Sequence, residues 1–247
     1  MELVAHLQHM ARGALDTLLP PRCYGCGAPV ADQGRLCPDC WSGLTFITPP
    51  RCACCGYPFD YAIGGDSLCA ACMARRPGYD VARSGLAYDD ASRRLVLAFK
   101  HGDRTHLAGP LAELMALAGD DLLKNADIIL PVPLHPGRLF RRRFNQAALL
   151  AGTLARRSDT DWSPTRLLRH RATSTQGGQS RRGRQRNVTG AFRMRGRLDD
   201  RAVLLIDDVM TTGATVEACA RCLRRAGARH IAVLTLARVV LPGHSPI

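Results

Sequence analysis

Four pairs of cysteines with the spacing C-x-x-C dominate the first third of this 247-residue chain. Nine of its eleven cysteines fall between Cys23 and Cys72. A C-x-x-C turn brings two thiolates to one tetrahedral ion, and two such turns complete a Cys₄ zinc site. The spacing therefore predicts a double zinc ribbon over residues 20–78, with one or two structural Zn²⁺ ions. The predicted ligands are Cys23, Cys26, Cys37, Cys40, Cys52, Cys55, Cys69 and Cys72.

Other roles for these cysteines fit less well. Disulfides need an oxidising compartment, and the N-terminus lacks the basic and apolar segments of a secretory signal. A redox C-x-x-C would account for one pair, not four. The spacing favours Cys55 over Cys54, and we take neighbouring pairs to share a site, although the sequence leaves an interleaved arrangement open. Cys219 and Cys222 lie in the apolar phase of a predicted helix, which indicates buried small side chains.

Composition and charge narrow the functional class. With 46% apolar and 22% charged residues the chain is typical of a globular protein, and no apolar run is long enough to cross a membrane. We therefore expect a cytoplasmic protein without membrane insertion, and residues 1–19 have the periodicity of an amphipathic helix. Residues 138–197 contain sixteen arginines and two aspartates, a net charge of +14. This zone suits the phosphates of a small molecule or a nucleic acid; the alternative is a solvated arginine-rich surface.

Beyond residue 80, short apolar runs alternate with segments of helical periodicity. This alternation predicts an α/β domain over residues 80–242, with a mainly parallel sheet covered by helices. Ligands of such sheets bind at the carboxyl ends of the strands. The predicted strands cover residues 84–88, 128–132, 202–206 and 231–237. The predicted helices cover residues 91–100, 107–118, 145–157 and 215–226.

The segment LLIDDVMTTGAT, residues 204–215, carries the most specific chemistry. Two aspartates, Asp207 and Asp208, end a buried strand, and a turn of small and hydroxylated residues leads into the next helix. Glycine, small residues and a helix N-terminus suit close wrapping around a phosphate. Paired carboxylates would repel that phosphate, but they accept hydrogen bonds from a diol or bind Mg²⁺. The segment therefore predicts a site for ribose 5-phosphate; the alternative is an ordinary helix cap with solvated charges.

This segment resembles the signature of the type I phosphoribosyltransferases, which bind phosphoribosyl pyrophosphate. The wider chain resembles the ComF family of competence proteins, in which a cysteine-rich zinc module precedes such a domain. The resemblance spans roughly residues 20 to 238. It rests on LCPDCW (36–41), AFKHGD (98–103), ILPVPLH (129–135), FNQAALLA (144–151), the T-x-x-Q of Thr173 and Gln176, RNVTGAF (186–192) and LLIDDVMTTGAT (204–215).

The resemblance implies a type I phosphoribosyltransferase-like fold that binds phosphoribosyl pyrophosphate with Mg²⁺. It implies catalytic roles for Asp207 and Asp208, which would hold the ribose, and for Lys100, which would contact pyrophosphate. Residues 169–187 correspond to a mobile catalytic loop of the relatives; the alternative is a basic linker. Arg143 stands where the family usually has glycine, which would force an unusual turn if that glycine has a positive φ. The implied substrate-binding residues are Thr211, Thr212, Gly213, Ala214, Thr215, Arg138, Arg171 and Gln176.

The sequence is compatible with three functions. The first is a phosphoribosyltransferase, a glycosyltransferase that moves pentosyl groups, supporting DNA uptake in natural competence. The second is a sensor that binds phosphoribosyl pyrophosphate without turnover. The third is a protein that binds single-stranded DNA or other competence proteins; the basic zone has only the aromatic residues Phe140, Phe144, Trp162 and Phe192, which favours phosphate contact over base stacking. Purine-specific relatives carry a carboxylate where this chain has Thr211, so the acceptor stays open.

Overall fold

The computed structural model describes residues 20–61, 64, 66–100, 104–171 and 188–240. The predicted helix over residues 1–19 and most of the predicted loop over residues 169–187 lie outside these ranges. The chain divides into two compact units, one up to Leu44 and one from Thr45 onward. The first four-cysteine cluster belongs to the first unit, and the second cluster shares its unit with the sheet.

The described part of the first unit is a small ribbon with one short helix, α2 (Pro38–Ser42). An antiparallel bridge joins Arg22 to Pro29 and closes the first C-x-x-C turn. Within residues 20–44, the buried hydrophobic side chains are those of Cys23, Cys37 and Leu44. So small an apolar core makes metal binding the main source of stability for this segment.

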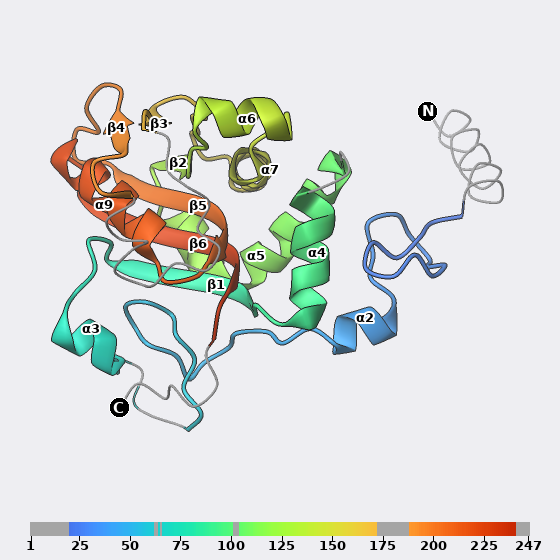
Figure 1. Cartoon of the computed structure of the whole chain (residues 1–247). Helices are drawn as coiled ribbons and strands as arrows, with labels where there is room; N and C mark the ends of the chain where they lie inside the picture. The colour runs from blue at the N-terminus through green and yellow to red at the C-terminus, as the bar shows by residue number, and fades with distance from the viewer. Residues whose placement is uncertain (1–19, 62–63, 65, 101–103, 172–187, 241–247) are drawn as a thin grey trace, which may run out of the picture. The chain divides into compact units, whose positions relative to one another are not determined.

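The second unit is built on a parallel sheet whose strand order is β1-β6-β5-β2 (Figure 1). The strands are β1 (Val81–Ala87), β6 (His230–Arg238), β5 (Ala202–Met210) and β2 (Ile128–Pro131). All three neighbouring pairs run parallel. The connecting helices are α4 (Asp90–Lys100), α5 (Ala108–Lys124), α7 (Gln146–Ser158) and α9 (Ala214–Arg225), and short helices form at α3 (Ala70–Ala74), η1 (Thr105–Leu107) and α6 (Pro136–Arg142). The predicted parallel α/β architecture is confirmed.

Strands β5 and β6 are buried on both sides because helices cover both faces of the sheet. Val203 and Leu205 belong to the apolar cluster that contains Cys219, Cys222 and Leu223 of α9. Side chains alternate along a strand, so the remaining residues of β5 face the opposite side, which α5 and α7 cover. Both cysteines of α9 are buried, as their apolar phase predicts. Cysteines of the second four-cysteine cluster belong to the apolar cluster on the α9 side.

Several features differ from the sequence prediction: helix α6 was not expected, α5 extends six residues past its expected end at residue 118, and β1 begins three residues before its expected start at residue 84. Strand β5 continues to Met210, where it pairs with Arg238 of β6, so Asp207 and Asp208 lie inside the strand and not just beyond it. The apolar run alone set the predicted end, but backbone pairing with the long β6 extends the strand through the acidic residues. An antiparallel pair, β3 (Leu167–Arg169) and β4 (Phe192–Met194), was not predicted, because each strand is only three residues long.

Arg143 has the strained conformation that the family glycine implied. It ends α6 with φ +64°, in the left-handed region that costs a residue with a Cβ about 1 kcal/mol or more. We expect Arg143→Gly to raise the free energy of unfolding by about 0.5–1 kcal/mol, seen as a rise of a few degrees in the thermal midpoint. Arg141→Gly, inside the same helix, is the matched control and should lower the thermal midpoint. A lower midpoint for Arg143→Gly would contradict the strain.

Candidate ligand-binding site and four-cysteine clusters

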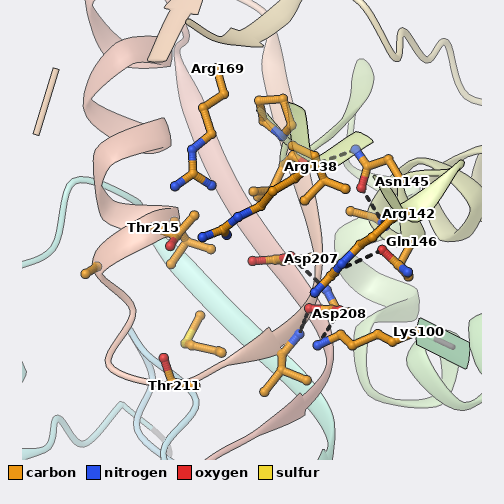
Figure 2. A pocket seen from close by; sticks show the side chains of 18 of the residues that line it. Lys100, Arg138, Arg142, Asn145, Gln146, Arg169, Asp207, Asp208, Thr211 and Thr215 are labelled. Carbon is orange, nitrogen blue, oxygen red and sulfur yellow. Dashed lines mark hydrogen bonds and ion pairs between the residues drawn. The ribbon is translucent and has the colours of Figure 1, made fainter. Parts of the chain in front are cut away.

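A cavity of about 620 Å³ opens at the carboxyl ends of β2 and β5. Elements far apart in the sequence supply its walls: the last residue of α4, helix α6, the N-terminus of α7, Arg169 of β3, and the turn between β5 and α9 (Figure 2). The charged residues that line it are Lys100, Arg138, Arg141, Arg142, Arg169, Asp207 and Asp208. Five cations therefore face two carboxylates, and the cavity has an excess of positive charge suited to an anion.

Backbone and side-chain contacts fix the two carboxylates. The amide of Asp208 donates to Asp207 Oδ1 at 2.9 Å, and the amide of Val209 donates to Asp208 Oδ1 at 2.7 Å. Lys100 Nζ lies 2.7 Å from Asp208 Oδ2, and both side chains are less than one-fifth exposed. This mostly buried ion pair compensates the negative charge of Asp208. The charge of Asp207 is therefore less well compensated than that of Asp208.

Asp207 has a strongly raised pKa. The pKa of its carboxyl is raised to about 8; burial is the largest cause and the adjacent negative charge of Asp208 the next, while the amide of Asp208, Lys100 and Arg169 act in the opposite direction. A carboxyl with a pKa near neutral pH in a cavity is a candidate functional group. A ligand that donates hydrogen bonds to Asp207, or brings a cation near it, would favour the ionised form.

The turn after β5 presents a helix N-terminus to the cavity. Gly213 has φ +75°, a conformation that favours glycine, and it caps α9, a helix of twelve residues. The amide of Glu217 donates to the Gly213 carbonyl, so the preceding amides of the first turn have no helical partner. Thr211, Gly213, Ala214 and Thr215 line the cavity. Such a helix start, with small residues around it, is suited to bind a phosphate.

The opposite wall is formed by arginines. Helix α6 begins after His135, whose Nδ1 accepts from the Gly137 amide, and it carries Arg138, Arg141 and Arg142 to the cavity. Burial lowers the pKa of Arg138, and the neighbouring charges of Arg142 and Arg141 lower it further. Arg169 is 6% exposed and lies over the ring of Phe192 at 5.5 Å. In Figure 2 the side chains of Arg138 and Arg169 extend toward the space in front of Asp207.

Most of the residues proposed from the sequence meet in this cavity. Lys100, Arg138, Asp207, Asp208 and four residues of the turn line it. Thr212 does not; its hydroxyl is buried and has no hydrogen-bond partner in the described part of the chain. Arg171 is exposed, donates to the Thr189 carbonyl at 2.7 Å and does not line the cavity. Gln176 lies outside the described residues.

Several lining residues had no individual predicted role: Arg141, Arg142, Asn145 and Gln146; Arg169 was predicted only as the start of the basic loop over residues 169–187. Asn145 caps α7, with its Oδ1 accepting from the Ala147 amide at 3.1 Å, and its Nδ2 donates to the Val132 carbonyl at 3.0 Å. Arg142 Nη1 donates to Gln146 Oε1 at 3.4 Å. The RRRFNQ segment, residues 141–146, was the available signal for four of them, because it places arginines and side-chain amides shortly after the strand that ends at Pro131.

The cysteines form two clusters from neighbouring pairs, and the interleaved arrangement is not seen. Within each cluster all four sulfurs lie within 4.8 Å of one another. The sulfurs of Cys26 and Cys37 are 3.6 Å apart, as are those of Cys55 and Cys69, close to the roughly 3.8 Å edge of a tetrahedron with 2.3 Å Zn–S bonds. Cys55, and not Cys54, joins the second cluster. The first cluster is Cys23, Cys26, Cys37 and Cys40; the second is Cys52, Cys55, Cys69 and Cys72.

Backbone amides complete the surroundings of these sulfurs. The amides of Gly25 and Cys37 donate to Cys23 Sγ at 3.3 and 3.2 Å. Those of Cys55 and Cys69 donate to Cys52 Sγ at 3.5 and 3.3 Å. Such donors stabilise thiolates, which are the form that binds zinc. Both clusters therefore fit a structural Zn²⁺, which would hold the ribbon turns together.

None of the helices in the described ranges is both long enough and apolar enough to span a bilayer.

Comparison with known proteins identifies both parts of the chain. Residues 14–73 match the model of the double zinc ribbon domain, and residues 146–240 match that of the phosphoribosyl transferase domain. The fold and the two matches define a phosphoribosyltransferase-type domain joined to a double zinc ribbon, and they support structural zinc.

Relatives of known name give the family. DNA utilization protein YhgH of Salmonella typhi is 32% identical over 224 residues, which cover 88% of this chain and 90% of the relative. The YhgH protein of Escherichia coli K12 is 33% identical over 70% of this chain and 78% of its own length. Competence protein F of Haemophilus influenzae is 34% identical over 69% and 78%. The chain belongs to the ComF family of competence proteins.

Proposed function

We propose that the protein binds phosphoribosyl pyrophosphate with Mg²⁺ and transfers its phosphoribosyl group to an acceptor, as a phosphoribosyltransferase. One observation carries this: a glycine-containing turn at a helix N-terminus, a carboxylate pair and five cations line one cavity. A ligand with a phosphate, a ribose and a pyrophosphate has a complementary group for each. The match to the phosphoribosyl transferase domain supports the same assignment.

Each wall of the cavity then has a role. The turn from Thr211 to Thr215 holds the 5-phosphate through amides and hydroxyls, and Asp207 and Asp208 accept hydrogen bonds from the ribose hydroxyls. Lys100 and Arg138 face the pyrophosphate, where positive charge stabilises the leaving group. The carboxylates and the ligand's own oxygens are the hard donors that Mg²⁺ prefers, so the site fits this ion. Bound Mg²⁺ would neutralise charge on the departing pyrophosphate.

The raised pKa of Asp207 predicts a pH dependence of binding. The free carboxyl, with a pKa of about 8, is mostly protonated at pH 7, whereas hydrogen bonds from ribose hydroxyls require the ionised form. Ligand binding should therefore release a proton, and the affinity for Mg²⁺-phosphoribosyl pyrophosphate should rise up to about tenfold between pH 7 and 9. Calorimetry in two buffers of different ionisation enthalpy measures the released proton. The same slope in Asp207→Asn would assign the titration to another group.

The transfer itself is tested in two steps. Calorimetry with phosphoribosyl pyrophosphate, ribose 5-phosphate and pyrophosphate, each with Mg²⁺, should show the strongest binding for the first, because it alone fills all three walls. A pyrophosphate-release assay with candidate nucleobases then identifies the acceptor. Tight binding without release for any acceptor would favour a non-catalytic sensor, and equal affinity for all three ligands would contradict the assigned site.

A second proposed activity is contact with single-stranded DNA. Phe140 on α6 is 89% exposed, next to Arg141 and Arg142 at the rim of the cavity. An aromatic side chain beside guanidinium groups suits an unpaired base and its phosphates. The names of the relatives, which mention DNA utilization and competence, support such a role in DNA uptake. Phe140→Ala should weaken binding of an oligothymidine about tenfold, whereas Asp208→Asn should not; unchanged affinity for Phe140→Ala would contradict this contact.

A further inference from the structure

Arg238 is a buried cation that joins the second four-cysteine cluster to the sheet. It is the last residue of β6 and is only 7% exposed. Its guanidinium donates to the Cys55 carbonyl and lies over the ring of Tyr57, 5.1 Å from its centre. Cys55 is a member of the cluster, and Tyr57 follows directly on its C-x-x-C turn. A guanidinium buried to this extent costs free energy unless its surroundings compensate the charge.

The segment around this cluster is also fixed to β1. The Ala82 amide donates to the Cys54 carbonyl at 2.7 Å, and Arg83 Nη1 donates to the Ala53 carbonyl at 3.2 Å. At Gly56 a Cβ would come within 2.4 Å of the Ala82 carbonyl oxygen, and the backbone has φ +67°, so only glycine fits. The C-x-x-C turn of the second cluster is therefore held to β1 by a main-chain hydrogen bond and to β1 and β6 by the side chains of Arg83 and Arg238.

The backbone of Arg238 in turn connects two segments that line the cavity. The Tyr88 amide donates to the Arg238 carbonyl at 2.7 Å. On the other side Arg238 pairs in register with Met210, and the Val239 amide donates to the Met210 carbonyl at 2.9 Å. Tyr88 and Met210 both line the cavity, and Met210 directly precedes the turn that begins at Thr211. Arg238 thus contacts the second four-cysteine cluster through its side chain, and through its main chain it contacts two residues that line the cavity.

Charge makes this connection sensitive to zinc. A Zn²⁺ ion with four thiolates has a net charge of about −2, and a nearby buried guanidinium compensates part of it. When the ion is lost the thiolates take up protons and become neutral thiols, so the guanidinium loses the negative charge beside it, and the turn that carries the Cys55 carbonyl is released. The end of β6 would then lose the contacts of the Arg238 side chain, and Met210 would lose a rigid neighbour.

We propose that Arg238 is a positioning residue that makes the shape of the phosphate-binding turn depend on zinc in the second cluster. The effect on ligand affinity rests on the proposed function; the effect on the turn does not. Since coupling between two sites is reciprocal, ligand binding should also raise the affinity of this cluster for zinc. The first cluster, whose residues belong to the other compact unit, has no part in these contacts.

Hydrogen exchange of the full-length, zinc-loaded protein tests the proposal without a ligand. In Arg238→Met, amides of residues 209–215 should exchange at least tenfold faster than in wild type, while those of β2 keep their protection. Arg238→Lys, which keeps the charge but loses the planar stacking, should be intermediate. Arg225→Met, at an exposed arginine of α9, is the matched control. Cys69→Ser in the second cluster should speed the same amides, and Cys26→Ser in the first should not.

The hydrogen-exchange results decide whether Arg238 positions the turn. Normal protection of residues 209–215 in both Arg238 variants would overturn the proposal, as would an equal effect of Cys26→Ser and Cys69→Ser. A second measurement follows the transfer of zinc to a colorimetric chelator in the Cys26→Ser variant. This variant should hold zinc only in the second cluster, so the signal comes from that cluster alone. Phosphoribosyl pyrophosphate with Mg²⁺ should lower the fraction of zinc that the chelator removes at equilibrium, and Arg238→Met should abolish this protection. If the wild type binds no phosphoribosyl pyrophosphate, the proposed function fails, and hydrogen exchange still decides the role of Arg238.

Discussion

The double change Asp207→Asn/Asp208→Asn should weaken binding of Mg²⁺-phosphoribosyl pyrophosphate at least 100-fold. Hydrogen bonds to charged groups contribute about 1.5–3 kcal/mol each, so the loss of two corresponds to roughly 100-fold to 10,000-fold in the dissociation constant. Calorimetry or competition with a fluorescent analogue measures it. Asp120→Asn/Asp121→Asn is the matched control, because these adjacent aspartates are exposed on α5, and it should bind as the wild type does.

Misfolding can be separated from the loss of binding by the pH dependence of stability. The pKa of Asp207 in the folded protein is raised to about 8, so the folded state disfavours the ionised carboxylate. The free energy of unfolding therefore falls as the pH rises from about 4 to about 8. Asp207→Asn should therefore unfold at a higher temperature than the wild type at pH 9 and show a smaller difference at pH 5. Weak binding together with a lower midpoint at pH 9 would attribute the defect to misfolding and contradict the assigned role.

Removal of zinc should unfold residues 20–44 and weaken the second unit without melting its sheet. The binding free energy of a structural zinc ion, about 10–16 kcal/mol, exceeds what the small apolar core of the first ribbon can supply. The second cluster, by contrast, packs within the apolar cluster under α9. A chelator should therefore expose residues 20–44 to proteolysis at once, whereas fragments from residues 45–79 should appear more slowly.

The matched variants are Cys26→Ser for the first ribbon and Cys69→Ser for the second. Metal analysis should find two zinc ions per wild-type chain and one in each variant. Cys69→Ser should lower the thermal midpoint of the sheet unit by 10 °C or more, and Cys26→Ser should leave it within about 2 °C. A wild-type protein that keeps its protease resistance after complete zinc removal would show that the ion does not determine the fold of the ribbons.

Sequence periodicity was sufficient for the architecture because each main element has a strong pattern. The buried strands are continuous apolar runs, and the helices α4 and α9 are clearly amphipathic, so the parallel sheet and its covering helices could be predicted. The eight ligand cysteines followed from C-x-x-C spacing, but their grouping by neighbouring pairs is decided by the structure, because the spacing left an interleaved arrangement open. The end of β5 could not be placed, since its last residues are held by pairing with β6 and carry no apolar signal.

The candidate site was only half predictable. Residues in one continuous motif, from Asp207 to Thr215, were found because their chemistry is local. Arg138 was assigned, but Arg141, Arg142 and Arg169 had no individual role, since tertiary packing decides which members of a long basic zone reach the cavity. The contacts of Arg238 are also invisible in the sequence, because they join β6 to a cysteine turn more than 180 residues earlier.

The most direct test of the central claim is a crystal structure of the protein with Mg²⁺ and phosphoribosyl pyrophosphate. We predict density for the 5-phosphate against the amides of the turn from Thr211 to Thr215, with the ribose hydroxyls facing Asp207 and Asp208. An empty turn at saturating ligand, or a ligand bound away from both aspartates, would contradict the account.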